Sequence, residues 1–257
     1  MLVWILWIIC LTIVTYASVY IIRHYPAYAY TALTGFYILY LCISQIGAAR
    51  IVEFNLGFTV LYAPASVFIY PFIAQVIDMI NEQYGEAKAH AAILITFVSQ
   101  VVLVLLFVMI NSLTPAPFFA YDSQWQEIFN QSIRITIASW AAFLICSNID
   151  AFVFAKLKER FKKQEQAFRH GTMINPWVWL RSTASDAANL TLDSIIFVVL
   201  AFAGTLPLIP LIIGQVIAKN IIGFIDNPWF VWYKSMLNKD KNAGMDGKTG
   251  DSVPPTE

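Results

Sequence analysis

The chain has 257 residues, of which 59% are hydrophobic and only 12% are charged, and its mean hydropathy is +0.65. So small a polar fraction cannot cover the surface of a water-soluble globule, and the composition therefore indicates an integral membrane protein. The 16 basic and 16 acidic residues give a formal net charge of zero, so the charge balance implies no nucleic acid or other polyanion as a partner.

Seven windows of about 20 apolar residues, the length that crosses roughly 30 Å of hydrocarbon, follow one another along the chain. They predict an all-α, polytopic transmembrane helical bundle with spans near residues 1–22, 27–49, 60–81, 89–113, 131–155, 176–203 and 208–233. The first window imitates a signal peptide, because Ala27-Tyr28-Ala29 resembles a cleavage site. It lacks a basic start, is too long and is followed by Arg23 and His24, so we expect a retained span.

The loop charges predict the orientation of the bundle. The segment KLKERFKKQEQAFRHG, after the fifth span, holds six basic residues, whereas TPAPFFAYDSQWQEIFN, before it, holds none. The positive-inside rule places the first segment in the cytoplasm and the second outside. Seven spans then put the N-terminus outside and the C-terminus in the cytoplasm. From about residue 238 the chain becomes polar and glycine-rich, which predicts a disordered tail.

The sequence contains no recognisable catalytic or nucleotide-binding motif. Its three cysteines lie in apolar runs without the spacing of a disulfide framework or a metal site, and its three histidines lie at loops or span ends. The GKT of the tail lacks the first glycine of a phosphate-binding loop. We therefore predict neither an enzyme nor an ATP-driven pump, and no cofactor or metal.

The third predicted span, within YPFIAQVIDMINEQYG, carries polar groups at a depth where a charge costs about 2.5–3.5 kcal/mol. Gln75, Asp78 and Glu82 are spaced i, i+3 and i+7, which places them on one helix face. Pro71 is predicted inside the same helix, where it would free the carbonyl of Val67. These groups mark either a pathway or, alternatively, a kink with a carboxylate pair that lysines hold near the cytoplasmic end.

The sixth predicted span begins with a polar stripe. Four of its residues are spaced i, i+4, i+7 and i+11 and so share one narrow helix face: Ser182, Asp186, Asn189 and Asp193. In the fifth span, Asp150 lies six residues before Lys156 and is either part of a site or an anchor at the membrane interface.

In the seventh span, Gln215, Lys219, Gly223 and Asp226 align on one face. Lys219 and Asp193 lie near the middle of their spans, and together they can stay ionised where each alone would lose its charge. One hypothesis is a pair that only clamps two helices. However, Asp78, Glu82, Asp150, Asp186, Asp193 and Asp226 outnumber Arg181 and Lys219. The surplus predicts waters, protons or a ligand that donates hydrogen bonds.

Four segments together resemble the queuosine precursor transporter family. They are YPFIAQVIDMINEQYG, NIDAFVFAKLK, LRSTASDAANLTLDSIIF and AKNIIGFIDNPWFVWY, in the family's order of motifs over roughly residues 30–236. The family-like positions are Pro71, Asp78, Glu82, Gly85, Asp150, Arg181, Ser185, Asp193, Lys219 and Pro228.

The resemblance implies a six-helix core that is related to the substrate-binding subunits of energy-coupling-factor vitamin transporters. It also implies import of 7-deazaguanines, such as 7-cyano-7-deazaguanine, across the cell membrane for salvage into transfer-RNA modification. We expect an additional helix at 1–22, a transporter core at 27–236 and the tail at 238–257. The expected partners are a small 7-deazapurine and membrane lipid, with no nucleic acid, while the oligomeric state stays unknown.

Two alternatives to this function stay open. The chain is either a capture subunit for another vitamin-like solute that works with a separate ATP-driven module, or a scaffold whose charges are all structural.

A deazaguanine carries N1–H and an exocyclic amine on one edge, which suits a carboxylate, and an O6 acceptor that suits Lys219, Asn189 or Gln75. Its ring would stack on an aromatic side chain such as Tyr70, Phe72 or Phe197. Asp186 and Asp193 are about 10 Å apart along a helix, so one purine cannot bond both closely. Asp78 and Glu82 lie at the cytoplasmic end of their span, and an antiparallel neighbour would bring them to the depth of Arg181 and Asp186. We therefore expect a binding layer and a cytoplasmic gate. The residues expected to meet the substrate are Asp193, Asn189, Lys219, Asp186, Gln75 and Phe197. Those expected to form the gate are Asp78, Glu82, Asp150 and Arg181.

Overall fold

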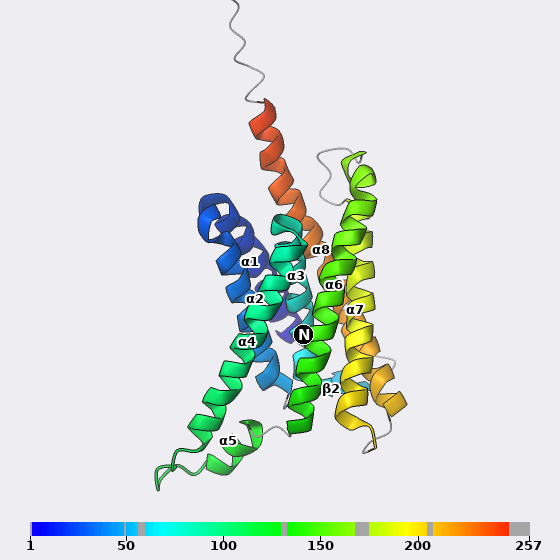
Figure 1. Cartoon of the computed structure of the whole chain (residues 1–257). Helices are drawn as coiled ribbons and strands as arrows, with labels where there is room; N and C mark the ends of the chain where they lie inside the picture. Colours follow the sequence, from blue (N-terminus) through cyan, green and yellow to red (C-terminus); the bar gives the residue numbers. More distant parts are fainter. Residues whose placement is uncertain are drawn as a thin grey trace, which may run out of the picture.

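The computed structural model describes residues 2–48, 50–55, 60–129, 133–167, 175–204 and 208–246, and these form a bundle of long helices (Figure 1). The long helices are α1 (Leu2–His24), α2 (Pro26–Ala48), α4 (Glu86–Asn111), α6 (Ile133–Ala167), α7 (Pro176–Phe202) and α8 (Leu208–Asp246). Each holds a segment that is long and apolar enough to cross a membrane. The predicted polytopic, all-α membrane protein is confirmed.

The third predicted span, 60–81, is not one continuous helix. Strands β1 (Ile51–Asn55) and β2 (Val60–Pro64) form an antiparallel hairpin in which Ile51 is opposite Pro64. A short 3-10 helix, η1 (Ala65–Phe68), then leads into α3 (Tyr70–Tyr84). Because proline lacks an N–H and fixes its own backbone, Pro64 does not continue a helix.

Pro71 lies in the first turn of α3 rather than in its interior. The predicted kink at this residue is therefore wrong, because a helix has no hydrogen bond to lose at its first turn. At the other end of α3, Gly85 has a φ of +86°, a backbone conformation that glycine adopts without strain. It separates α3 from α4.

Helix α3 lies at the centre of the bundle. It has only 15 residues, and 11 of them are buried, with α2, α4, α6 and α8 packed around it. The 3-10 turn before it packs against α2 and α8, and its Ser66 and Val67 are buried. Irregular backbone is tolerated at membrane depth only where protein or a cavity surrounds it, and these neighbours provide that cover.

Helix α1 packs over the irregular segment from the periphery of the bundle. The indole N–H of Trp7 donates to the carbonyl of Phe68, at 3.0 Å, and the Trp7 ring contacts Phe72 and Trp229 edge-on. Trp229 in turn donates from its indole to the hydroxyl of Thr12. The additional N-terminal helix is therefore packed into the bundle.

Two helices are longer than the sequence pattern indicates. Helix α6 continues to Ala167, through most of the basic segment that we predicted as a loop, and α8 continues to Asp246, so that the first part of the predicted tail is helical. The α6 extension is rich in Lys, Glu and Gln, which favour helices. Residues 168–174 and 247–257 lie outside the described residues.

The orientation of the bundle stays a prediction with a direct test. The C-terminal part of α8 lies at the opposite end of the bundle from the short helix α5 (Asp122–Phe129) (Figure 1). A reporter fused after Asn238 should therefore read cytoplasmic and one inserted near Ser123 should read external. An external signal from the C-terminal fusion would contradict the predicted number of crossings.

Candidate functional site

Buried polar side chains line the sides of α3, α6, α7 and α8 that face one another. Helix α7 is placed by its first turn, where the side chain of Asn175 accepts from the backbone N–H of Trp177, at 3.0 Å, and Pro176 opens the helix. With this start, the predicted stripe faces inward, and Ser182, Asp186 and Asp193 are all at most 7% exposed. The polar groups fall into successive layers along the helices.

The first layer is an ion pair between α7 and α8. The ammonium of Lys219 contacts the carboxylate of Asp193, and their residues are 1% and 4% exposed. The ammonium also lies 3.7 Å from the centre of the Tyr70 ring, a cation–π contact. At this level, Gly223 allows close packing of α8 on α7, because an added Cβ would lie 2.8 Å from the Leu190 side chain. The pairing of Lys219 with Asp193 is present in the structure.

The aromatic residue at this pair is Tyr70, not Phe197. The Phe197 ring lies one turn beyond Asp193 and packs edge-on against Phe202, with centroids 5.9 Å apart. Phe72 packs instead against Trp7, with centroids 6.0 Å apart. The role of Phe197 at the substrate stays a prediction.

The second layer consists of amide side chains. Gln75 on α3 is 5% exposed, and neither polar atom of its amide has a hydrogen-bond partner among the described residues. The amide oxygen of Asn189, on α7 between Asp186 and Asp193, likewise has no partner in the described chain. A buried polar group left unpaired costs about 1–3 kcal/mol, so these atoms favour a site for a polar ligand.

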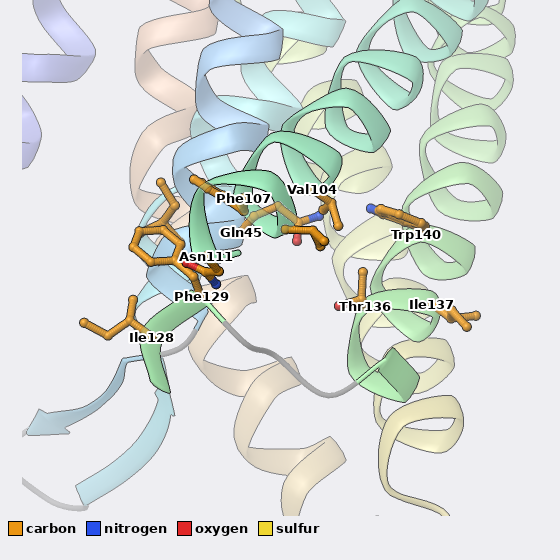
Figure 2. Close-up of a pocket in the computed structure, with 11 residues that line it drawn as sticks. Gln45, Val104, Phe107, Asn111, Ile128, Phe129, Thr136, Ile137 and Trp140 are labelled. Atoms are coloured by element: carbon orange, nitrogen blue, oxygen red, sulfur yellow. The ribbon is translucent and has the colours of Figure 1, made fainter. Parts of the chain in front are cut away.

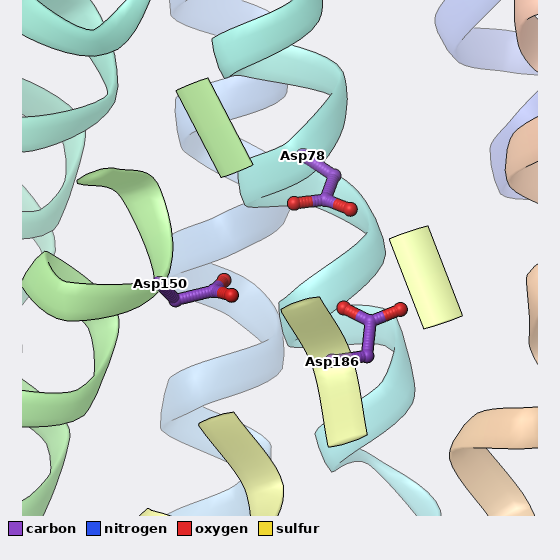
Figure 3. A group of neighbouring side chains, drawn as sticks. All are labelled: Asp78, Asp150 and Asp186. Atoms are coloured by element: carbon purple, nitrogen blue, oxygen red, sulfur yellow. The ribbon is translucent and has the colours of Figure 1, made fainter. Parts of the chain in front are cut away.

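The third layer is a group of three carboxylates from three helices. Figure 3 shows Asp78 from α3, Asp150 from α6 and Asp186 from α7 pointing toward one another, and one oxygen of each lies within 4.8 Å of the others. Two serines of α7 accompany them. Ser185 donates to Asp150 at 2.7 Å, and the hydroxyl of Ser182 lies 3.2 Å from Asp78 and 3.3 Å from Asp186.

These carboxylates are not fully satisfied by the protein. Within the described residues, Oδ2 of Asp150 and Oδ1 of Asp186 have no hydrogen-bond partner. Asp78 and Asp150 are each 1% exposed and Asp186 is 7% exposed. A set of oxygen ligands of this kind can hold protons, a hard cation or the N–H groups of a ligand.

The fourth layer is an ionic network at the predicted cytoplasmic end. Arg181 donates to Glu165 at 2.6 Å and to Glu82 at 2.9 Å. Lys234 contacts both carboxylates, and its distance to Glu82 is 3.1 Å. Lys158 lies 3.5 Å from the Glu82 carboxylate and donates to its backbone carbonyl at 2.7 Å. Five charges thus join α3, α6, α7 and α8.

Arg181 is the centre of this network and is completely buried. Its guanidinium lies 4.5 Å from the ring centre of Phe154 and 5.8 Å from that of Phe230. A planar guanidinium combines two carboxylate partners with stacking on aromatic rings in a way that a lysine cannot. Breaking such a buried pair leaves an uncompensated charge and costs about 3–5 kcal/mol.

The structure divides the predicted gate into two groups. Glu82 and Arg181 belong to the ionic network, whereas Asp78 and Asp150 lie with Asp186, which we had grouped with the substrate. The expected depth is right, because α3 brings Glu82 to Arg181 and Asp78 to the neighbourhood of Asp186.

Glu165 and Lys234 are not among the residues expected at the site, because both lie outside the predicted spans. Asp150, Lys158 and Glu165 are spaced i, i+8 and i+15 and would share one face of a helix extended beyond Lys156. That periodicity is the signal that could have found Glu165.

A separate cavity of about 430 Å³ lies between α2, α4, α5 and α6 (Figure 2). Phe107, Phe129 and Trp140 are among the aromatic and aliphatic side chains that line it, and no carboxylate or basic side chain is among the lining residues of the described chain. Ten residues of α6, about 15 Å, separate Trp140 from Asp150. The polar layers are therefore the candidate site.

Comparison with known families decides the class of protein. Residues 64–233 match the family described as "Putative vitamin uptake transporter". The chain belongs to this family. With six apolar helices in the described part of the chain, membership makes the chain a multi-pass membrane transporter of a small molecule. The matched range holds the ion pair, the amides and the three carboxylates, and it leaves out α1.

Among curated proteins, the chain is similar to a probable queuosine precursor transporter of Bacillus subtilis (strain 168). The two are 27% identical over 171 residues, which cover 65% of this chain and 69% of the relative. No solved structure matches the chain.

The ion pair between α7 and α8 can be tested by stability. Changing Lys219→Met alone leaves Asp193 buried without its cation, and we expect a loss of about 3–5 kcal/mol. Adding Asp193→Asn should restore most of that loss, because the double variant buries no unpaired charge. Thermal unfolding in detergent would measure all variants. Equal losses in the single and double variants would show that the two groups are not partners.

Proposed function

We propose that this chain imports 7-deazaguanine bases such as 7-cyano-7-deazaguanine, a precursor of queuosine, for salvage into transfer RNA. The relative from B. subtilis is named for queuosine precursors, and the layers of the site supply chemistry that suits such a base. The substrate is held, on this proposal, between α3, α6, α7 and α8, at the depth between Asp193 and Asp186.

The observation that carries the proposal is the buried pair of Lys219 and Asp193. It presents a donor and an acceptor side by side. The edge of a guanine-type base has the matching order, because the O6 acceptor stands next to the N1–H donor. Lys219 would bind O6 and Asp193 would accept from N1–H, each as a charge-assisted hydrogen bond. An adenine-type base presents the reverse order, with a donor in place of O6, and would leave both charged groups mismatched.

The other layers complete the site. Both polar atoms of the Gln75 amide and the amide oxygen of Asn189 have no partner in the described residues. These amides can bond the remaining N–H and nitrogen groups of the base, and the Tyr70 ring offers a face for stacking. Asp186 closes the site on the cytoplasmic side. A site of this kind rejects a base without the right donors, because its buried polar groups would then stay unpaired.

The ionic network of Glu82, Glu165, Arg181, Lys158 and Lys234 lies beyond the three carboxylates. It joins four helices, so a solute can pass to the cytoplasm only when these ion pairs separate. We assign it the role of cytoplasmic gate. Import then requires that binding of the base is coupled to opening of the network.

The proposed role of Asp193 differs from that of Asp78, and variants separate them. Asp193→Asn should abolish binding, because an amide presents donors to the donors of the base. Asp78→Asn should leave equilibrium binding nearly intact and slow transport. Calorimetry on purified protein and uptake of labelled 7-cyano-7-deazaguanine into cells that cannot synthesise it measure the two properties. Loss of binding in Asp78→Asn together with retained binding in Asp193→Asn would refute this division.

Two further variants control for folding. Gln75→Leu keeps the shape of a side chain whose polar atoms have no partner in the described protein. It should fold at least as well as the wild type and weaken binding about tenfold, which corresponds to 1.4 kcal/mol. Ser194→Ala is the matched control, because the hydroxyl of Ser194 bonds the carbonyl of Leu190 in its own helix. Uptake that requires a co-purifying ATPase would instead favour a capture subunit with a separate ATP-driven module.

A further inference from the structure

The hydroxyl of Ser182 lies between two carboxylates. Its oxygen is 3.2 Å from Oδ2 of Asp78 and 3.3 Å from Oδ2 of Asp186. A hydroxyl has one proton and can donate to only one acceptor. The second contact is a hydrogen bond only if that carboxyl carries a proton and donates it to Ser182. If both contacts are hydrogen bonds, the group holds one proton more than the serine supplies.

The rest of the cluster does not supply this proton. Ser185 donates to Asp150, so two hydroxyl protons serve three carboxylates. Within the described chain, Oδ2 of Asp150 and Oδ1 of Asp186 have no partner at all. Ser182, Asp78 and Asp186 are 1%, 1% and 7% exposed. Bulk water therefore does not reach the group in this conformation.

Nor do the neighbouring cations neutralise it. The charged and titratable groups on the helices packed around the cluster include Tyr37 on α2, Glu82 on α3, Lys158 and Glu165 on α6, Arg181 and Asp193 on α7, and Lys219, Asp226, Tyr233 and Lys234 on α8. Helix α4 adds Glu86, Lys88 and His90 in its first turns.

Each of the four cations nearest along these helices already has an acidic partner outside the cluster. Arg181, Lys158 and Lys234 contact Glu82 or Glu165, and Lys219 contacts Asp193. Asp226 adds a further buried acid that interacts electrostatically with Asp186. The neutral base of the proposed function would donate hydrogen bonds but would not remove this negative charge.

We propose that Asp78, Ser182 and Asp186 form a proton relay. With each imported solute, one proton reaches these residues from the outside and is released from them to the cytoplasm. The carboxyl that takes the proton from external water returns it to cytoplasmic water, so the relay ends each cycle in its starting state. Only the identity of the solute rests on the proposed function.

The neighbouring gate provides a way to release the proton. Arg181 lies about one turn of α7 from Asp186 and interacts electrostatically with Asp78 and Asp186. Its Nη1 has no partner in the described residues. When Arg181 separates from Glu82 and Glu165 to open the gate, its guanidinium can turn toward the carboxylates and displace the proton. Opening of the exit and loss of the proton would then be one event.

The first test does not depend on the solute. Infrared spectra of the purified protein in lipid nanodiscs should show the carbonyl stretch of a protonated buried carboxyl. Ser182→Ala should shift this band, because it removes the partner of the protonated group, whereas Ser194→Ala should leave it in place. Absence of the band, or the same spectrum from both serine variants, would overturn the relay whether or not the chain transports a deazaguanine.

The second test measures coupling in proteoliposomes with labelled 7-cyano-7-deazaguanine. An acidic exterior should drive accumulation up to about tenfold for each unit of pH difference, the limit for one proton per solute. Ser182→Ala should lose this accumulation and keep exchange of internal for external base, while Ser194→Ala should behave as the wild type. Accumulation driven by a sodium gradient at equal pH would assign the cluster to a metal cation and overturn the proton relay. Absence of any exchange would refute the proposed solute while leaving the infrared result as the test of the relay.

Discussion

The cost of burying charge in a bilayer is the constraint that orders the interior of this protein. A lone charge in hydrocarbon is expensive, and so the acids and bases of the bundle are grouped. Lys219 has Asp193, and Arg181 and Lys234 share Glu82 and Glu165. Between these two compensated groups lie three carboxylates, and two of them have an oxygen without a hydrogen-bond donor in the described part of the chain. The uncompensated negative charge of these carboxylates lies at one depth of the bundle, and it favours binding of a cargo and a coupling proton at that depth.

The broken third span makes this arrangement possible. Strands β1 and β2 and the turn η1 replace the first half of the predicted third helix. As a result α3 begins at Tyr70, whose ring contacts the Lys219 ammonium. Helix α3 is short enough to be surrounded by four other helices, and its polar face is therefore turned entirely into the bundle. Transporters commonly build their sites at such discontinuous helices, where backbone and side chains at mid-membrane are available to a solute. Helix α1 covers the irregular segment through Trp7, which bonds the carbonyl of Phe68.

Much of the site followed from helical periodicity, and what did not has identifiable causes. The stripe on α7, the common face of Gln75, Asp78 and Glu82, and the match in depth between α3 and α7 depend only on 3.6 residues per turn and antiparallel neighbours. The hairpin was missed because Val60–Pro64 is as apolar as a helix would be, so hydropathy alone does not separate the two. Glu165 was missed because it lies in a basic segment whose composition is typical of a loop, and Lys234 was missed because it lies just beyond the apolar window 208–233. The aromatic partner of Lys219 depends on how rings pack in three dimensions, and sequence spacing does not distinguish Tyr70 from Phe197.

The central claim is that the base is held between the Lys219–Asp193 pair and the three carboxylates. Photo-crosslinking tests it most directly, with a photoreactive derivative of 7-cyano-7-deazaguanine, purified wild-type protein and peptide mapping by mass spectrometry. The account predicts adducts on α3 and α7, within residues 70–78 and 186–193, that excess unlabelled base suppresses. Adducts confined to the apolar cavity lined by Phe107, Phe129 and Trp140 would contradict it.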